Sequence, residues 1–401
     1  MRRRLRANVV AGAFLMLATL PGRTQGLGLV TEPMLDDLSL DRIGYANVNL
    51  WASLLGALVC LPTGRFIDRI GLRPVAFVLL GGLALSTLGL SLHTGGITAL
   101  FVWLFLSRAF GQSGLSVAAI ASVAKSGSGR NAGALGAFSV LLSLLFIAAF
   151  VAVGASVSGS GWRTAWQQVA AGIGLFVLPL AFIVLREPGP SETSLSPEKA
   201  DEGGLGLSEA LRTPLFWIVS GAVASFAFAS SGIGLFNEAI LAEVGHPRET
   251  YHLFLAVTTG FALLGQGLCG WLGRRLPQPQ LLGSALAAYA LSLALLVRAA
   301  DPLVLWTAAA LTGLGAGFVT VLFFAIWGDA YGPRQLGRIQ GVAQGLTVVA
   351  SALGPLAFAA VQGWSGSYAP ALLGLGFAAL VFAIASFVLP FGNRTSAHHP
   401  A

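Results

Sequence analysis

Two arginines, Arg23 and Arg108, lie inside long apolar stretches, whereas the other basic residues fall in short polar segments. An arginine at mid-bilayer depth costs roughly 2.5 to 3.5 kcal/mol on insertion scales, so it faces a partner, a cavity or a ligand rather than lipid. Its guanidinium is a planar fork of donors that suits a carboxylate or a similar oxyanion. The two residues therefore indicate a pathway for something negatively charged.

Polar residues near these arginines could complete such a site. We expect Arg23 and Arg108 to contact the ligand, with Thr19, Asn49 and Gln112 as polar neighbours. For Arg23 two other roles stay open: a salt bridge to an acid, and snorkelling to the membrane surface. For Arg108 the alternative is a purely structural contact between helices.

The sequence around Arg23 suggests an irregular helix. Pro21 and Gly22 precede it and can loosen the helix locally, which would free a backbone carbonyl beside the charge. Of the acidic residues, only Glu32 and Glu238 approach the membrane away from loops. A desolvated carboxylate there could carry a proton. The alternatives are that Glu32 pairs with Arg23 or lies in interfacial water.

The composition identifies an integral membrane protein. The chain of 401 residues is 55% hydrophobic and only 10% charged, with 52 glycines, and its mean hydropathy is +0.79. Its basic residues are scattered between apolar segments, so no basic face for nucleic acid is expected. Neither a phosphate-binding loop nor a spaced metal or catalytic set of histidines occurs. We therefore expect neither an enzyme nor a cofactor.

Apolar segments long enough to cross a bilayer recur about twelve times, which predicts an all-α membrane protein with twelve transmembrane helices. The expected spans are 8–36, 44–63, 74–92, 97–123, 132–157, 164–186, 214–241, 250–272, 280–299, 303–327, 338–361 and 370–391.

The positive charges predict the orientation, because cytoplasmic loops retain Lys and Arg. With the N-terminus inside, 17 of the 23 basic residues fall on the cytoplasmic side. These are Arg2, Arg3, Arg4, Arg6, Arg65, Arg69, Arg73, Lys125, Arg130, Arg186, Lys199, Arg212, Arg274, Arg275, Arg334, Arg338 and Arg394. We therefore expect both termini in the cytoplasm and the protein in the plasma or inner membrane.

An internal repeat divides the chain into two halves. A shift of 206 positions places Glu32 on Glu238 and Arg42 on Arg248, and it also matches glycines and a tyrosine: Gly26 with Gly232, Gly28 with Gly234, Tyr45 with Tyr251, and Gly64 with Gly270. A polar, proline-containing stretch separates the halves. The sequence thus predicts a six-helix bundle over 1–187, a linker over 188–213 and a second six-helix bundle over 214–401, related by pseudo-symmetry.

One short turn carries a recognisable motif. The residues from Gly64 to Pro74 read GRFIDRIGLRP, in which Gly64, Asp68, Arg69, Gly71 and Arg73 match the signature between the second and third helices of the major facilitator superfamily. The chain resembles that superfamily over nearly its whole length. The alternative is an ordinary positively charged cytoplasmic loop.

The resemblance implies a role for each part of this motif. Gly64 would let two helices approach closely, and Asp68 near a helix N-terminus would meet the positive end of a helix dipole. Asp68, Arg69 and Arg73, with Gly71, would form a cytoplasmic gate. Arg108 begins a stretch similar to the fourth-helix motif of the superfamily, although Gln112 stands where that pattern has Gly.

These features together predict a secondary transporter of a small organic anion, because arginines in helices one and four resemble those of the organic-anion branches of the superfamily. Two halves would rock around a midplane cavity, coupled to protons or exchanging one anion for another, with Glu32 and Glu238 as candidate proton carriers. We expect a monomer in contact with lipid. An exporter of amphiphilic compounds and a non-transporting sensor or scaffold remain the alternatives.

Overall fold

The computed structural model describes residues 2–124, 132–185, 204–332 and 335–388, and within these ranges every regular element is a helix. The first half has the following helices: α1 Arg2–Ala18, η1 Leu20–Gly22, α2 Thr24–Gly28, α3 Thr31–Leu38, α4 Arg42–Ala57, α5 Cys60–Ile70, α6 Leu72–Ser91, α7 Ile97–Ser107, η2 Arg108–Leu115, α8 Ser116–Ala124, α9 Ala132–Ala171, η3 Gly172–Val177 and α10 Leu178–Val184.

The second half is more regular and has one helix for each predicted span, preceded by the short α11. Its helices are α11 Leu207–Ala210, α12 Pro214–Glu243, α13 Arg248–Leu272, α14 Gln278–Leu296, α15 Pro302–Tyr331, α16 Leu336–Ser365 and α17 Ala369–Val388. Of the predicted linker, 188–203 lies outside the described residues. So do the basic residues Lys125, Arg130, Arg186, Lys199, Arg334 and Arg394, on which part of the predicted orientation rests.

Ten segments of the described chain are long and apolar enough to cross a bilayer. One of them, Gly136–Val184, contains two helices, because the backbone reverses at Gly161, where φ is +81°. Across this turn Ser156 donates a hydrogen bond to Gln168 over 2.8 Å. With the first, interrupted helix these segments make twelve, so the predicted all-α fold of twelve transmembrane helices is confirmed.

The first transmembrane segment is interrupted, whereas we expected one continuous helix over 8–36. Helix α1 ends at Ala18, a 3-10 turn follows, and Arg23 adopts an extended conformation with φ −93° and ψ 151° before α2 begins. Pro21 removes a backbone donor at this point. Gly22 packs against the end of α7, since a Cβ there would lie 2.2 Å from the Ser107 carbonyl oxygen. The expected local loosening is in fact a complete break.

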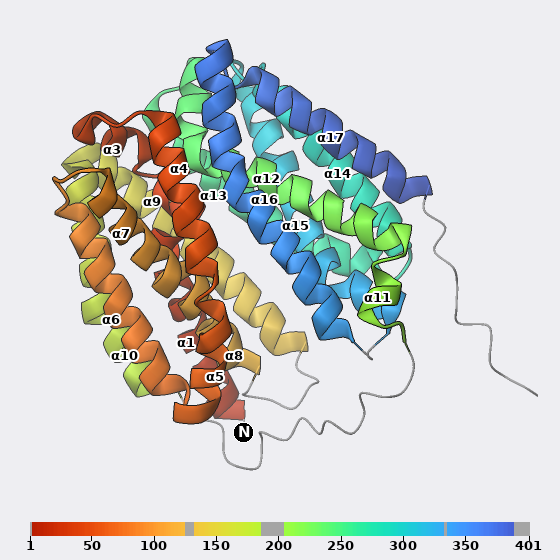
Figure 1. Ribbon diagram of the computed structural model, residues 1–401, viewed down its shortest axis with the longest axis horizontal. Helices are drawn as coiled ribbons and strands as arrows, with labels where there is room; N and C mark the ends of the chain where they lie inside the picture. The colour runs from red at the N-terminus through yellow and green to blue at the C-terminus, as the bar shows by residue number, and fades with distance from the viewer. Residues whose placement is uncertain (1, 125–131, 186–203, 333–334, 389–401) are drawn as a thin grey trace, which may run out of the picture.

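The two halves form two groups of helices that converge at one end of the molecule (Figure 1). Contacts between the halves join α4 to α16, α9 to α13, and α2 to α12. A single hydrophobic core spans both halves at the end that carries α3, whereas separate cores fill each half toward the end where the N-terminus lies. The molecule is therefore closed at the α3 end, and its halves part at the other.

The closed end rests on a crossing of two glycines that occupy matching positions in the repeat. A Cβ on Gly28 would lie 2.0 Å from the carbonyl oxygen of Gly234 and 2.6 Å from the Tyr251 hydroxyl. That hydroxyl also donates a hydrogen bond of 3.4 Å to the carbonyl of Gln25. Backbones that approach this closely leave no room for a side chain, so glycine at this position allows the two halves to seal.

The repeat is also visible in two ion pairs. Glu32 binds Arg42 with a shortest separation of 2.5 Å, and Glu238 binds Arg248 at the matching position of the second half. Both carboxylates are largely buried, whereas both arginines are partly exposed. The alternative in which Glu32 pairs with Arg23 is wrong, because the Glu32 carboxylate is held by Arg42.

Replacing Gly28 with alanine should force the halves apart at the closed end. The overpacked methyl group should destabilise the folded protein by about 1 to 3 kcal/mol, seen as a lower melting temperature in detergent. Gly81→Ala is the matched control, because a Cβ there meets nothing within 4 Å. Equal melting temperatures for the two variants would contradict the proposed crossing.

Removing Arg248 should destabilise the folded protein more than removing its partner Glu238. Arg248→Gln leaves the buried Glu238 carboxylate without its cation and should cost about 2 to 4 kcal/mol of stability. Glu238→Gln leaves only a partly exposed arginine and should cost less. The double variant should recover most of the loss caused by Arg248→Gln. Thermal unfolding of all three variants checks this order, and a double variant less stable than Arg248→Gln would refute it.

Candidate functional site

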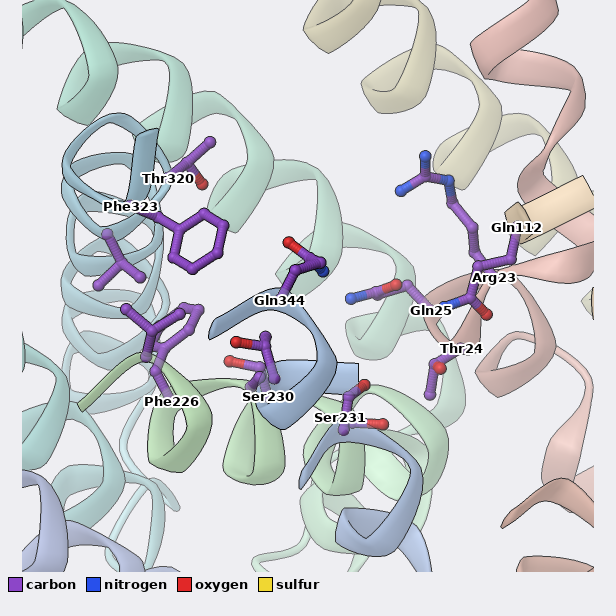
Figure 2. Close-up of a pocket in the computed structure, with 15 residues that line it drawn as sticks. Arg23, Thr24, Gln25, Gln112, Phe226, Ser230, Ser231, Thr320, Phe323 and Gln344 are labelled. Carbon is purple, nitrogen blue, oxygen red and sulfur yellow. The ribbon is translucent and has the colours of Figure 1, made fainter. Parts of the chain in front are cut away.

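A cavity of about 340 Å³ lies between the two halves, on the open side of the glycine crossing. Figure 2 shows residues of the first half on one wall and residues of α12, α15 and α16 facing them. The first half contributes Arg23, Thr24, Gln25 and Gln112. The second half contributes Val223, Phe226, Ala227, Ser230, Ser231, Val319, Thr320, Phe323, Gln344, Thr347 and Ser351.

Arg23 is the charged residue of this lining, and the break in the first helix places it there. Its guanidinium donates to the Thr19 hydroxyl over 2.6 Å, contacts the Met16 sulfur at 2.8 Å and reaches Ser116 at 3.4 Å. It also lies 5.6 Å from the centre of the Phe146 ring. All of these partners are neutral. Among the ion pairs of the described residues, none involves Arg23, so its positive charge is not balanced there.

Arg108 lies behind the cavity wall, only 1% exposed. It donates hydrogen bonds to the Gly22 carbonyl at 3.1 Å and to the Thr24 hydroxyl at 3.0 Å. It also donates to the side-chain oxygens of Gln112 and Asn49, each at 2.5 Å. Arg108 thus joins the fourth helix to the broken first helix and to α4, and three of these bonds hold groups beside the cavity.

The predicted polar neighbours divide into two layers. Gln112 lines the cavity, whereas Thr19 and Asn49 are fully buried and bind the arginines from behind. The five residues predicted for the site thus lie in one region, and Arg23 and Gln112 face the cavity in this conformation.

The fourth transmembrane helix departs from α-helical geometry from Arg108 to Leu115. The turn η2 is π-helical, and Gly22 of η1 packs closely against it: a Cβ on Gly22 would lie 2.9 Å from the Gln112 amide nitrogen and 3.1 Å from the Cα of Gly111. Wide turns of this kind occur often at functional sites. Here the widened turn lies directly against the break in the first helix.

The wall from the second half was not predicted. Its residues follow helical stripes, since Val223, Phe226, Ala227 and Ser230 on α12 lie at positions i, i+3, i+4 and i+7. On α16, Gln344, Thr347 and Ser351 repeat in the same way. Polar stripes in apolar helices are the sequence signal for such a wall, whereas charge alone points only to the first half.

The residues of the turn motif lie at the open end of the first half (Figure 1). Asp68 lies in the last turn of α5, shortly before α6 begins at Leu72, and its side chain lies outside the described residues, so its predicted contact with a helix N-terminus stays a prediction. Arg69 is exposed, and Gly71, with φ +97°, links α5 to α6. The close helix approach expected at Gly64 is not made in this conformation, since a Cβ there meets none of the described atoms within 4 Å.

Arg73, the last residue of the motif, contacts its own half. Its Nε donates a hydrogen bond of 2.5 Å to the carbonyl of Leu185, which directly follows α10. This bond joins the beginning of α6 to the end of the sixth transmembrane helix.

Comparison with protein families now decides the affiliation of the chain. The model of the Major Facilitator Superfamily matches residues 11–237 and again residues 219–400. The chain belongs to the Major Facilitator Superfamily. The resemblance seen in the turn motif is therefore confirmed, and the protein is a multi-pass membrane protein of the transporter type. No curated protein matches the sequence.

Solved structures share this fold at low sequence identity. A bacterial homologue of the human lysosomal transporter Spinster, in an inward-facing and occupied conformation, has 18% identity and a TM-score of 0.69, and each chain is covered to 94%. The nucleoside transporter NupG has 15% identity and a TM-score of 0.75, with 97% of this chain and 100% of NupG covered. At such identities the likeness concerns the fold.

Replacing Arg108 should destabilise the protein more than replacing an exposed arginine. Arg108→Gln removes donors from the buried Gly22 carbonyl and from Asn49, which should cost about 2 to 5 kcal/mol. Arg108→Lys should restore only part of this, because an ammonium lacks the planar fork. Melting temperatures in detergent test the order. As a control, Arg69→Gln should leave the temperature unchanged, and an equally stable Arg108→Gln would be inconsistent with the described contacts.

Proposed function

We propose that the protein is a secondary active transporter that moves a small, monocarboxylate-like organic anion across the membrane. The observation that carries this proposal is the charge of the cavity: of its fifteen lining residues, Arg23 alone is charged. The remaining polar residues offer hydroxyl and amide groups. An anion could thus receive both a cation and hydrogen bonds in one place.

The surroundings of Arg23 favour a negatively charged ligand. Its described partners are a hydroxyl, a thioether and a second hydroxyl, none of which carries a compensating charge. A partly buried charge without a counter-ion is unfavourable, and a bound carboxylate would reduce that cost. The positive charge comes from the first half alone, because the position of the second half that matches Arg23 in the repeat is the apolar Ala229.

Transport requires that the cavity reach both sides of the membrane in turn. The closed α3 end and the parted opposite end correspond to one of these two states. If the termini are cytoplasmic, as the basic residues predict, the cavity faces the cytoplasm here. Asp68, Arg69 and Arg73 then lie on the side that must close in the other state, and we propose that they form the gate there.

The ion pairs at the closed end supply a coupling device. Opening this end separates the halves near Glu32 and Glu238, the two largely buried carboxylates. A proton taken up by either would neutralise the carboxylate and weaken its pair with Arg42 or Arg248 in the same half, which would link proton uptake to the movement of the halves at this end. Transport would then be proton-coupled. If neither carries a proton, exchange of one anion for another remains.

Arg23→Ala should abolish anion transport, while Arg23→Lys should retain a part of it. Counterflow of labelled lactate in proteoliposomes measures this directly, with labelled benzoate and a cationic dye as further substrates. Arg298→Gln, an exposed arginine in a loop, is the matched control and should transport at the wild-type rate.

Three outcomes of this assay separate the candidate functions. Loss of lactate counterflow in Arg23→Ala alone supports the proposal. Lactate counterflow unchanged by Arg23→Ala overturns it. Transport of the dye without lactate or benzoate would identify an exporter of cationic or amphiphilic compounds, and transport of none of the three would point to a non-transporting sensor or scaffold.

A further inference from the structure

The wall opposite Arg23 is aromatic. Phe226 of α12 and Phe323 of α15 line the same cavity as the guanidinium, and Figure 2 shows both on the far side from it. Val223 and Val319 extend this wall with further apolar surface. The cavity is therefore polarised: one side offers a positive charge and amides, and the other offers phenyl rings and aliphatic side chains among hydroxyl groups.

Buried aromatic residues hold both rings from behind. The Phe226 ring packs on Tyr289 of α14, with centroids 4.6 Å apart, and the Tyr289 hydroxyl shares a hydrogen bond of 3.0 Å with Ser230. The Phe323 ring meets Trp327 edge to face, with centroids 6.3 Å apart. Both supporting residues are completely buried. Rings fixed in this way form a wall that is ready before a ligand binds.

The charge of the cavity limits the charge of its ligand. One guanidinium can balance one carboxylate, and part of its donor set is already bound to Thr19, Met16 and Ser116. A second carboxylate on the same ligand would face hydroxyls, amides or phenyl rings without a cation. Leaving such a charge uncompensated in a partly desolvated site is costly.

The volume argues against the smallest anions. The cavity measures about 340 Å³, whereas a single water molecule needs only roughly 10 to 15 Å³ of such space. An anion of three or four heavy atoms bound at Arg23 would leave most of this space, including the aromatic wall, to water. A ligand with an apolar ring would instead cover the wall and bury apolar surface, which favours binding.

We propose that the cavity selects organic monoanions with an aryl or similarly flat apolar group, whose carboxylate binds Arg23 and whose ring lies against Phe226 and Phe323. This inference rests on the proposed function for the anionic group and goes beyond it in the body of the ligand. The side chains of Gln25 and Gln344 lie between the two walls in Figure 2, where they could bind neutral polar substituents.

The direct test is equilibrium binding to the purified full-length protein, measured by titration calorimetry with four probes. Benzoate carries both groups, acetate lacks the ring, benzamide lacks the charge and phthalate carries a second charge. Benzoate should bind at least about tenfold more tightly than each of the others, because acetate buries no ring, benzamide offers no charge to Arg23 and phthalate brings a second charge without a cation. Phe226→Ala should weaken benzoate about tenfold and leave acetate unchanged.

Controls distinguish a failure of the proposed aromatic selectivity from a failure of the proposed anion site. Phe377→Ala, on a ring that is 70% exposed on α17, should leave every affinity unchanged. Equal affinities for benzoate and acetate, both lost in Arg23→Ala, would overturn the aromatic selectivity and leave the anion site intact. Anion binding that persists in Arg23→Ala would overturn both. The comparison of probes on the wild-type protein decides the question even if Phe226→Ala does not fold.

Discussion

The site depends on how the break in the first transmembrane helix is held. A bare break would leave backbone groups without partners in a membrane, where each one costs several kcal/mol. Arg108 supplies a partner for the Gly22 carbonyl and also donates to the Thr24 hydroxyl, while the side-chain oxygens of Asn49 and Gln112 accept from the same guanidinium. Because the broken segment is fixed in this way, Arg23 takes an extended conformation and lines the cavity. The two arginines thus have different positions: one supports the wall and the other forms it.

The two halves share a repeat but differ at the cavity. At the closed end they are alike: the Gly28 and Gly234 backbones touch, and each half has its own ion pair between a buried glutamate and a more exposed arginine. At the cavity the first half provides the charge, whereas the second provides phenyl rings and hydroxyls. Symmetry therefore governs how the halves meet, and its loss creates a site with two chemically distinct ends.

The number of helices and the repeat could be predicted from the sequence, whereas most of the contacts around the cavity could not, and each outcome has a physical reason. Bilayer thickness fixes the length of apolar segments, so twelve helices could be counted, and the repeat placed Glu32 and Arg42 on Glu238 and Arg248. Pro21 and Gly22 indicated a weak point, although not a complete break. Asn49 and Gln112 were predicted as polar neighbours of the arginines, but the bond from Arg108 to the Gly22 carbonyl and the wall of Phe226 and Phe323 could not be predicted. Hydropathy reports how apolar a helix is, but not which of its faces turns to lipid, to a neighbour or to a cavity.

An anion bound at Arg23 with its apolar part toward the second half is the central claim. A crystal structure of the protein with 4-bromobenzoate tests this claim most directly, because bromine scatters anomalously and marks the ring. We predict a carboxylate within hydrogen-bonding distance of Arg23 and a bromine peak beside Phe226 and Phe323. A ligand bound in the cavity with its carboxylate away from Arg23, or a bromine peak only outside the cavity, would contradict the claim.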